Sequence, residues 1–108
     1  MFIETKTFTV KEGTSDLVVN HFTGKGIIEK SEGFIDLSVL VKKVRRGDEE
    51  VIVMIRWESE EAWKNWETSE EHIEGHKQSR GKPKPDHIIN VTHSVYYVKS
   101  SKGAFQQS

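Results

Sequence analysis

Two apolar runs, separated by a short turn that contains glycine, occupy the middle of the chain. The first covers residues 34–44, and the second, over residues 51–57, reads Val-Ile-Val-Met-Ile-Arg-Trp. The turn between them is Arg45-Arg46-Gly47-Asp48. Two runs of this kind joined by such a turn are typical of a β-hairpin. The sequence therefore predicts two adjacent antiparallel strands at this point.

Two further strands and a helix are predicted from the flanking segments. Residues 1–10 alternate loosely and carry several threonines, and residues 88–98 are rich in valine and tyrosine, which favours strands in both places. Good N-cap residues at 14–16 precede a predicted helix over residues 17–22. Gly24 and the glycine two residues later are expected to end this helix, because glycine adopts a left-handed C-cap conformation without strain.

A second helix is predicted between the hairpin and the last strand. Ser59-Glu60-Glu61 starts it with a cap residue followed by acids, which favour the positive end of the helix dipole. The run Thr68-Ser69-Glu70-Glu71 repeats this signal, so we expect the helix to break and restart there. The helix then continues through His76 and ends at Gly81, and the prolines that follow favour extended chain.

The resulting order, β-α-β-β-α-β, predicts an α+β domain of the ferredoxin-like kind, with one antiparallel sheet and the helices on one face. We expect one domain over residues 1–99 and a polar C-terminal tail over residues 100–108. A chain of 108 residues, of which 34% are hydrophobic, has little apolar surface to spare for the other face of its sheet. A second copy is the economical cover. We therefore predict a homodimer whose sheets meet face to face, a dimeric α/β barrel.

Composition argues against several classes of function. The net charge is -1 with the two signs nearly balanced, which argues against nucleic-acid binding and against a polybasic membrane anchor. The chain contains no cysteine, so disulfides, thiolate catalysis and thiolate metal sites are excluded. The sequence shows neither a signal-peptide pattern nor a run of about 20 apolar residues. We therefore expect a cytoplasmic protein with no membrane partner.

Three tryptophans and two histidines gather around the predicted second helix. They are Trp57, Trp63, Trp66, His72 and His76. Trp63 and Trp66 lie on one helical face because they are three residues apart, and a helix break would let Trp66 and His76 face the same site. Spacing alone leaves core packing of the tryptophans and solvent exposure of the histidines open. His72 and His76 form at most half of a zinc site, since no third ligand stands at zinc spacing.

The segment from Trp57 to His76 resembles the heme-degrading monooxygenases of the IsdG and HmoA type, in the wider antibiotic-biosynthesis monooxygenase superfamily. It reads Trp-Glu-Ser-Glu-Glu-Ala-Trp-Lys-Asn-Trp-Glu-Thr-Ser-Glu-Glu-His-Ile-Glu-Gly-His and is most similar to the HmoA branch. The positions that match the family pattern are Trp57, Ser59, Trp63, Trp66, Ser69 and His76, and upstream Phe22, Ile28-Glu29 and Glu32-Gly33-Phe34. The resemblance extends from Phe2 to Val98.

The resemblance implies a function and roles for individual residues. Heme is implied as both substrate and cofactor, and its ring is opened with O2 and electrons so that iron is released. His76 is implied as the proximal ligand of the heme iron, Trp66 as the bulky side chain that holds the macrocycle out of plane, and Phe22 as a residue that lines the site. The electrons are expected from an external reductase, because the chain has no dinucleotide or flavin fingerprint.

Lys6 departs from the family pattern. The family has an asparagine at this position of the first strand, where it donates a hydrogen bond, whereas Lys6 offers three donors and a charge. A catalytic contact with the substrate and exposure to solvent both remain open for Lys6. His87 and His93, near the last strand, have no partner that the sequence reveals, and His21 is expected to be exposed.

Three other functions remain open from the sequence. A non-catalytic heme-binding or heme-buffering protein of the same fold would keep heme intact in reductant and oxygen. A cofactor-free monooxygenase of polycyclic phenols would bind heme weakly. A structural dimer without a small-molecule role would have an interior filled by the tryptophans.

Overall fold

The computed structural model describes residues 1–24, 26–79 and 85–104, and the side chains within these ranges apart from those of residues 75–79. Within them, four strands form one antiparallel sheet in the order β2-β3-β1-β4. The elements are β1 (Phe2–Val10), α1 (Ser15–Thr23), η1 (Ile28–Lys30), β2 (Phe34–Val41), β3 (Glu49–Trp57), α2 (Glu60–Glu67), α3 (Glu70–Ser79) and β4 (Ile88–Tyr97). None of these helices is long and apolar enough to cross a membrane.

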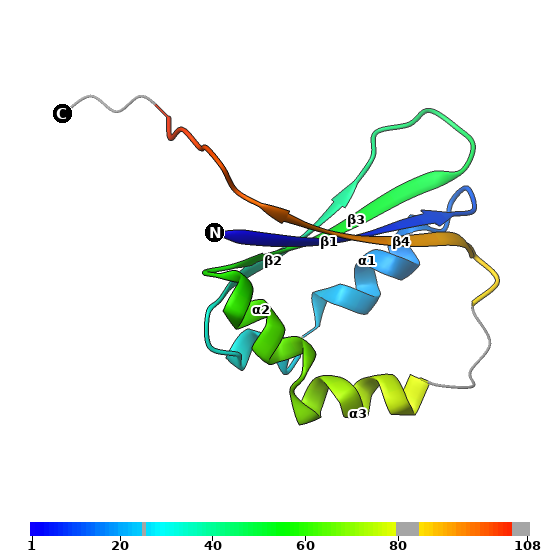
Figure 1. The fold of residues 1–108 in the computed structure, drawn as a ribbon. Helices are drawn as coiled ribbons and strands as arrows, with labels where there is room; N and C mark the ends of the chain where they lie inside the picture. Colours follow the sequence, from blue (N-terminus) through cyan, green and yellow to red (C-terminus); the bar gives the residue numbers. More distant parts are fainter. Residues whose placement is uncertain (25, 80–84, 105–108) are drawn as a thin grey trace.

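The predicted α+β, ferredoxin-like fold is confirmed. The order of strands and helices is the expected one, with the second helix divided into α2 and α3. Figure 1 shows α1, α2 and α3 on one side of the sheet, so the helices occupy one face as predicted. We call this side of the sheet the inner face and the opposite side the outer face.

The core lies on the inner face, between the helices and the two central strands, β3 and β1. On β3, Val51, Val53, Ile55 and Trp57 are buried and alternate with half-buried residues. Because successive side chains of a strand point to opposite faces, the buried ones mark the inner face of β3. Phe2 on β1 joins the last three in one core cluster. The tryptophan at the end of the predicted hairpin is therefore a core residue.

The hairpin is confirmed with shifted ends. β2 ends at Val41 rather than at the predicted residue 44, and β3 begins at Glu49 rather than at 51. The backbone N–H of Lys42 donates to the carbonyl of Glu50 at 2.9 Å, just beyond the end of β2. The chain that follows carries four basic residues and Gly47, and the pairing of the two strands stops there.

Helix α1 is confirmed, but its two ends are made differently from the prediction. The Thr14 hydroxyl does not cap the helix. The Glu49 carboxylate accepts a hydrogen bond from the backbone N–H of Ser15 at 3.0 Å instead. Gly24 follows the helix with φ −77° and ψ 166°, an extended conformation, so the expected left-handed C-cap is wrong. The N-terminal contact comes from a residue 34 positions away, which no local pattern reveals.

Helices α2 and α3 meet at the predicted break. The Ser59 hydroxyl accepts a hydrogen bond from the Ala62 N–H at 3.1 Å, and the Ser69 hydroxyl accepts one from the His72 N–H at 3.2 Å. Each helix therefore has its own side-chain N-cap. Gly33, with φ 85°, lets α2 approach the sheet closely, since a Cβ added there would lie 2.4 Å from the Cβ of Ala62.

Candidate functional site

Among the described residues, the helices pack on one half of the inner face and leave apolar side chains of the other half exposed. Helices α1 and α2 pack on β2 and β3, where the inner side chains of β3 are fully buried. The register of β4 on β1 places Val91, His93 and Val95 on the same face. Val91 and Val95 are nevertheless 44% and 40% exposed. We call the open half the inner strip, and it consists of Lys6, Val91, His93 and Val95.

Trp66 joins α2 to the core. Its side chain is half-buried and packs against the core cluster, as does that of Trp63 three residues earlier. The shared helical face predicted for the two tryptophans is therefore confirmed. The Trp63 ring lies 5.1 Å from the ring of Phe2. The Trp66 ring meets the His72 imidazole edge-on at 5.1 Å, across the break between α2 and α3.

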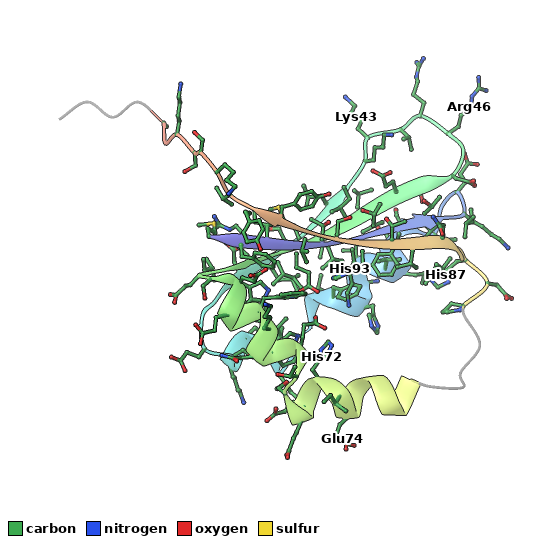
Figure 2. The ribbon with its side chains drawn as sticks, viewed as in Figure 1. Lys43, Arg46, His72, Glu74, His87 and His93 are labelled. Carbon is green, nitrogen blue, oxygen red and sulfur yellow. The ribbon has the colours of Figure 1, made fainter. Side chains whose placement is uncertain are left out.

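Helix α3 carries the two histidines of the motif. His76 lies within the bounds of α3, but its side chain is outside the described ones, so its expected position in the site stays a prediction. The His72 imidazole Nε2 is 3.3 Å from a carboxylate oxygen of Glu67, and Figure 2 shows this side chain on the sheet side of α3. Among the described residues there is no group of three metal-ligating side chains.

Phe22 enters the site from α1. It is half-buried, with its ring 5.7 Å from that of Phe8 on β1, and it packs against the same core cluster as Trp66. The structure therefore brings Phe22 and Trp66 to one cluster from two different helices. His21, the neighbour of Phe22, is exposed as expected.

Lys6 stands at the centre of the open half. On β1 it lies opposite Val53 of β3 and His93 of β4, so it faces the helices, with Thr5 and Thr7 on the outer face. Its side chain is half-buried. The contact of Lys6 with a substrate stays a prediction.

A buried carboxylate beside Lys6 escaped the sequence analysis. Glu4 is 2% exposed, and one of its carboxylate oxygens lies 2.8 Å from Nε2 of His93. The expectation that His93 has no partner is wrong. The two residues are 89 positions apart, so only strand pairing brings them together. The sequence held one signal of this contact. Glu4 is an acid on β1 that shares the inner face with Phe2 and Phe8.

Several buried polar atoms in this region lack a hydrogen-bond partner among the described residues. They are the second carboxylate oxygen of Glu4 and the indole nitrogens of Trp57 and Trp63. Buried polar atoms are ordinarily paired, so each exception calls for an explanation. The Glu4 oxygen is the most unusual of them, because leaving a carboxylate without partners costs more than leaving an indole N–H.

Two hydrogen-bonded contacts between ionisable side chains lie outside the candidate site. The Tyr97 hydroxyl donates to the Glu60 carboxylate at 2.6 Å, which joins the end of β4 to α2, and this hydrogen bond raises the pKa of Tyr97. On the outer face, the Arg56 guanidinium donates hydrogen bonds to the Asp36 carboxylate and lowers the pKa of Asp36. Both contacts hold neighbouring elements together.

The open half suits a flat, largely apolar ligand with a few polar groups. Such a ligand would remove Val91 and Val95 from water, and aromatic side chains of α1 and α2 border the region. Lys6 would supply positive charge from the sheet, and both Lys6 and His93 would supply hydrogen bonds. The covered half offers nothing comparable, because its side chains are already packed.

Comparison with known proteins identifies related sequences along the whole chain. The family model described as antibiotic biosynthesis monooxygenase matches residues 1–78. The heme-degrading monooxygenase HmoA of Bacillus subtilis (strain 168) is 56% identical over 108 residues, which cover 99% of this chain and 100% of HmoA. A heme-degrading monooxygenase of Halalkalibacterium halodurans is 30% identical over 103 residues, covering 95% of this chain and 86% of the relative.

A solved structure shares the fold as well as the sequence. The crystal structure of an antibiotic biosynthesis monooxygenase from Bacillus cereus, assigned to that class without proof of activity, superposes with a TM-score of 0.87. It is 82% identical, and the match covers 98% of each chain.

Proposed function

The chain belongs to the antibiotic biosynthesis monooxygenase family, and we propose that it is a heme-degrading monooxygenase. In this proposal it opens the porphyrin ring with O2 and electrons and releases the iron. The observation that carries the proposal is the 56% identity to HmoA over the full length of both proteins. The Trp57–His76 segment, which carries the family motif, runs from the end of β3 through α2 into α3.

The side chains around the inner strip fit a heme. A porphyrin is flat and largely apolar with two carboxylates at one edge, and the strip combines exposed valines with a lysine and a histidine. Half-buried Phe22 and Trp66 add aromatic surface from the helices. When bound, heme supplies an iron centre that reacts with oxygen and the ring carbon that is oxidised.

Individual roles follow the family motif. His76 on α3 would bind the iron, Trp66 would pack against the macrocycle, and Phe22 would line the site. Lys6, on the sheet side, would donate a hydrogen bond to the substrate or pair with a propionate. An external reductase would supply the electrons. The cytoplasmic location stays a prediction from the sequence.

A homodimer would complete the fold, because no described element covers the outer face. That face carries large apolar side chains in addition to polar ones: Ile3, Leu40, Ile52, Met54 and Tyr96. Leu40 and Tyr96 are exposed. Exposed apolar surface of this kind marks an interface. Sedimentation of the unaltered protein and of a Met54→Glu variant tests the dimer, which should dissociate in the variant, whereas a monomeric unaltered protein would contradict it.

The function is tested by titration with hemin, followed by ascorbate in air with catalase present to remove free peroxide. A saturable Soret band that decays as chelatable iron appears would establish the enzyme. His76→Ala should bind hemin without the normal ligand band and lose ring opening, and His87→Ala serves as the control. A Soret band that persists in reductant would indicate a heme buffer, and no band at all would indicate a phenol oxygenase.

A further inference from the structure

We propose that His93 contacts the heme from the sheet side as a hydrogen-bond donor, and that Glu4 is the positioning residue that holds His93 in this role. The inference rests on the proposed function and assigns two residues that the motif leaves out. The carboxylate of Glu4 is an unusual group among the described residues, because it is buried with one oxygen unpaired.

Packing does not explain an acid at position 4. Glu4 is 2% exposed on a face built from apolar side chains, and one of its oxygens has no partner among the described residues. Burial of a carboxylate costs free energy that a single hydrogen bond does not restore, and an apolar side chain of similar size would avoid this cost. A buried acid that weakens the fold at this position points to a function.

His93 is the hydrogen-bond partner of Glu4. The side chain of His93 is 44% exposed, although its Nε2 atom lies 2.8 Å from the buried Glu4 oxygen. Figure 2 shows His93 on the helix side of β4, the side on which α3 also lies. The contact fixes Nε2 toward the core, so Nδ1 is the ring atom left to face a ligand on the inner strip.

The Glu4–His93 pair can offer a hydrogen-bond donor to a ligand. An anion bound beside the pair favours the form in which Glu4 and His93 share one additional proton, because this form carries no net charge of its own. If the proton is on Glu4, the carboxyl donates to Nε2 and neutral His93 carries its hydrogen on Nδ1. If it is on His93, both ring nitrogens carry hydrogen. Either placement offers an N–H from Nδ1, and Lys6, directly opposite on β1, adds a positive charge.

A donor on this side would act on an anion at the iron. In the proposed function His76 of α3 would hold the iron, and His93 and Lys6 lie on the face of the sheet on which the helices lie. In heme proteins, hydrogen-bond donors on the side of the heme opposite the protein ligand influence whether a small ligand such as O2 is bound or activated. A hydrogen bond to a charged group changes binding by about 10-fold or more.

Fluoride affinity of the ferric heme complex is the measurement that tests the proposal. The full chain is loaded with hemin and titrated with fluoride, and the charge-transfer band of the complex is recorded. His93→Gln keeps a donor for Glu4 but removes Nδ1, and should weaken fluoride binding about 10-fold. Glu4→Gln keeps the size of the side chain and removes the buried charge. It should weaken fluoride binding by a similar factor while the protein unfolds at the same or a higher urea concentration. His87→Gln is the matched control, since His87 is outside the strip.

The outcomes separate the two proposals. Hemin binding with equal fluoride affinity in all variants would overturn the role of His93 and leave the proposed function intact. A loss in His93→Gln alone would overturn the positioning role of Glu4. Absence of a Soret band in the unaltered protein would overturn the proposed function, and this inference with it.

Discussion

Val53 and Val95 are the same residue type on the same face of one sheet, yet they have opposite surroundings. Val53, on β3, is 0% exposed under α1 and α2, whereas Val95, two strands away on β4, is 40% exposed. The covered half is a folding core, in which each side chain contributes to stability by leaving water. The open half contributes little in this way. Its apolar side chains are available to a ligand, which explains why one small sheet can serve both purposes.

Helices α2 and α3 also differ in the contacts that hold them in place. α2 is held by the close approach of Ala62 to Gly33 and by the contact between Trp63 and Phe2. α3 is attached to α2 through Ser69 and through the ring contact of His72 with Trp66. We expect changes at the contacts of α2 to affect folding, and changes at those of α3 to affect ligand binding.

The largest effect is expected where α2 touches the sheet. Gly33→Ala forces a positive φ on alanine and places a Cβ against Ala62, which should lower the free energy of unfolding by about 3 kcal/mol. Gly13→Ala has a similar φ of 80° but open space around it, and should cost about 1 kcal/mol. Urea denaturation of both variants measures the difference. Equal losses would show that α2 is not packed tightly on the sheet.

The two valines give the direct test of the comparison. Val53→Ala should lower the free energy of unfolding by about 2 kcal/mol, because it removes two buried methyl groups and leaves a void. Val95→Ala should cost less than about 1 kcal/mol, but should weaken hemin binding by up to about 10-fold. Denaturation and hemin titration are performed on both variants. A Val95→Ala protein with unchanged hemin affinity would show that the inner strip is not the heme site.

A smaller effect is expected at the two helix caps. Ser59→Ala and Ser69→Ala each remove a side-chain N-cap worth about 1 kcal/mol. The first should appear in global unfolding, since α2 is part of the core. The second should appear as faster amide exchange in α3 and weaker hemin binding, with the urea midpoint nearly unchanged. Identical behaviour of the two variants would contradict the distinction between α2 and α3.

The smallest effect is a dependence of the covered half on pH. The hydrogen bond from the Ser15 N–H lowers the pKa of Glu49 below its ordinary value of 4.5. A lowered pKa in the folded state means that the contribution is complete above pH 4.5 and is lost as the pH falls through the folded pKa. Glu49→Gln should flatten the fall of the urea midpoint below that pH. An unchanged slope would show that this contact does not stabilise α1.

Much of the fold was predictable because its signals are local. Ser59 and Ser69 are each followed by acids within the next two residues, and both cap a helix as expected. Core packing, which spacing left open for the tryptophans, holds for Trp57, which is 0% exposed. The same local signals failed at Thr14 and Gly24, where a contact with Glu49 and an extended backbone replaced the expected caps.

The sequence by itself determined the order of the elements, the hairpin, the helix break and the Trp57–His76 motif, because each depends on residues close together in the chain. Only the tertiary structure decided which edge of the sheet the helices leave open and that Glu4 is buried against His93. Strand order and helix placement bring together residues 89 positions apart, and their contact depends on how the whole chain packs. The candidate site was therefore partly visible in the sequence, through the helices and Lys6, while the contact of Glu4 with His93 emerged only from the fold.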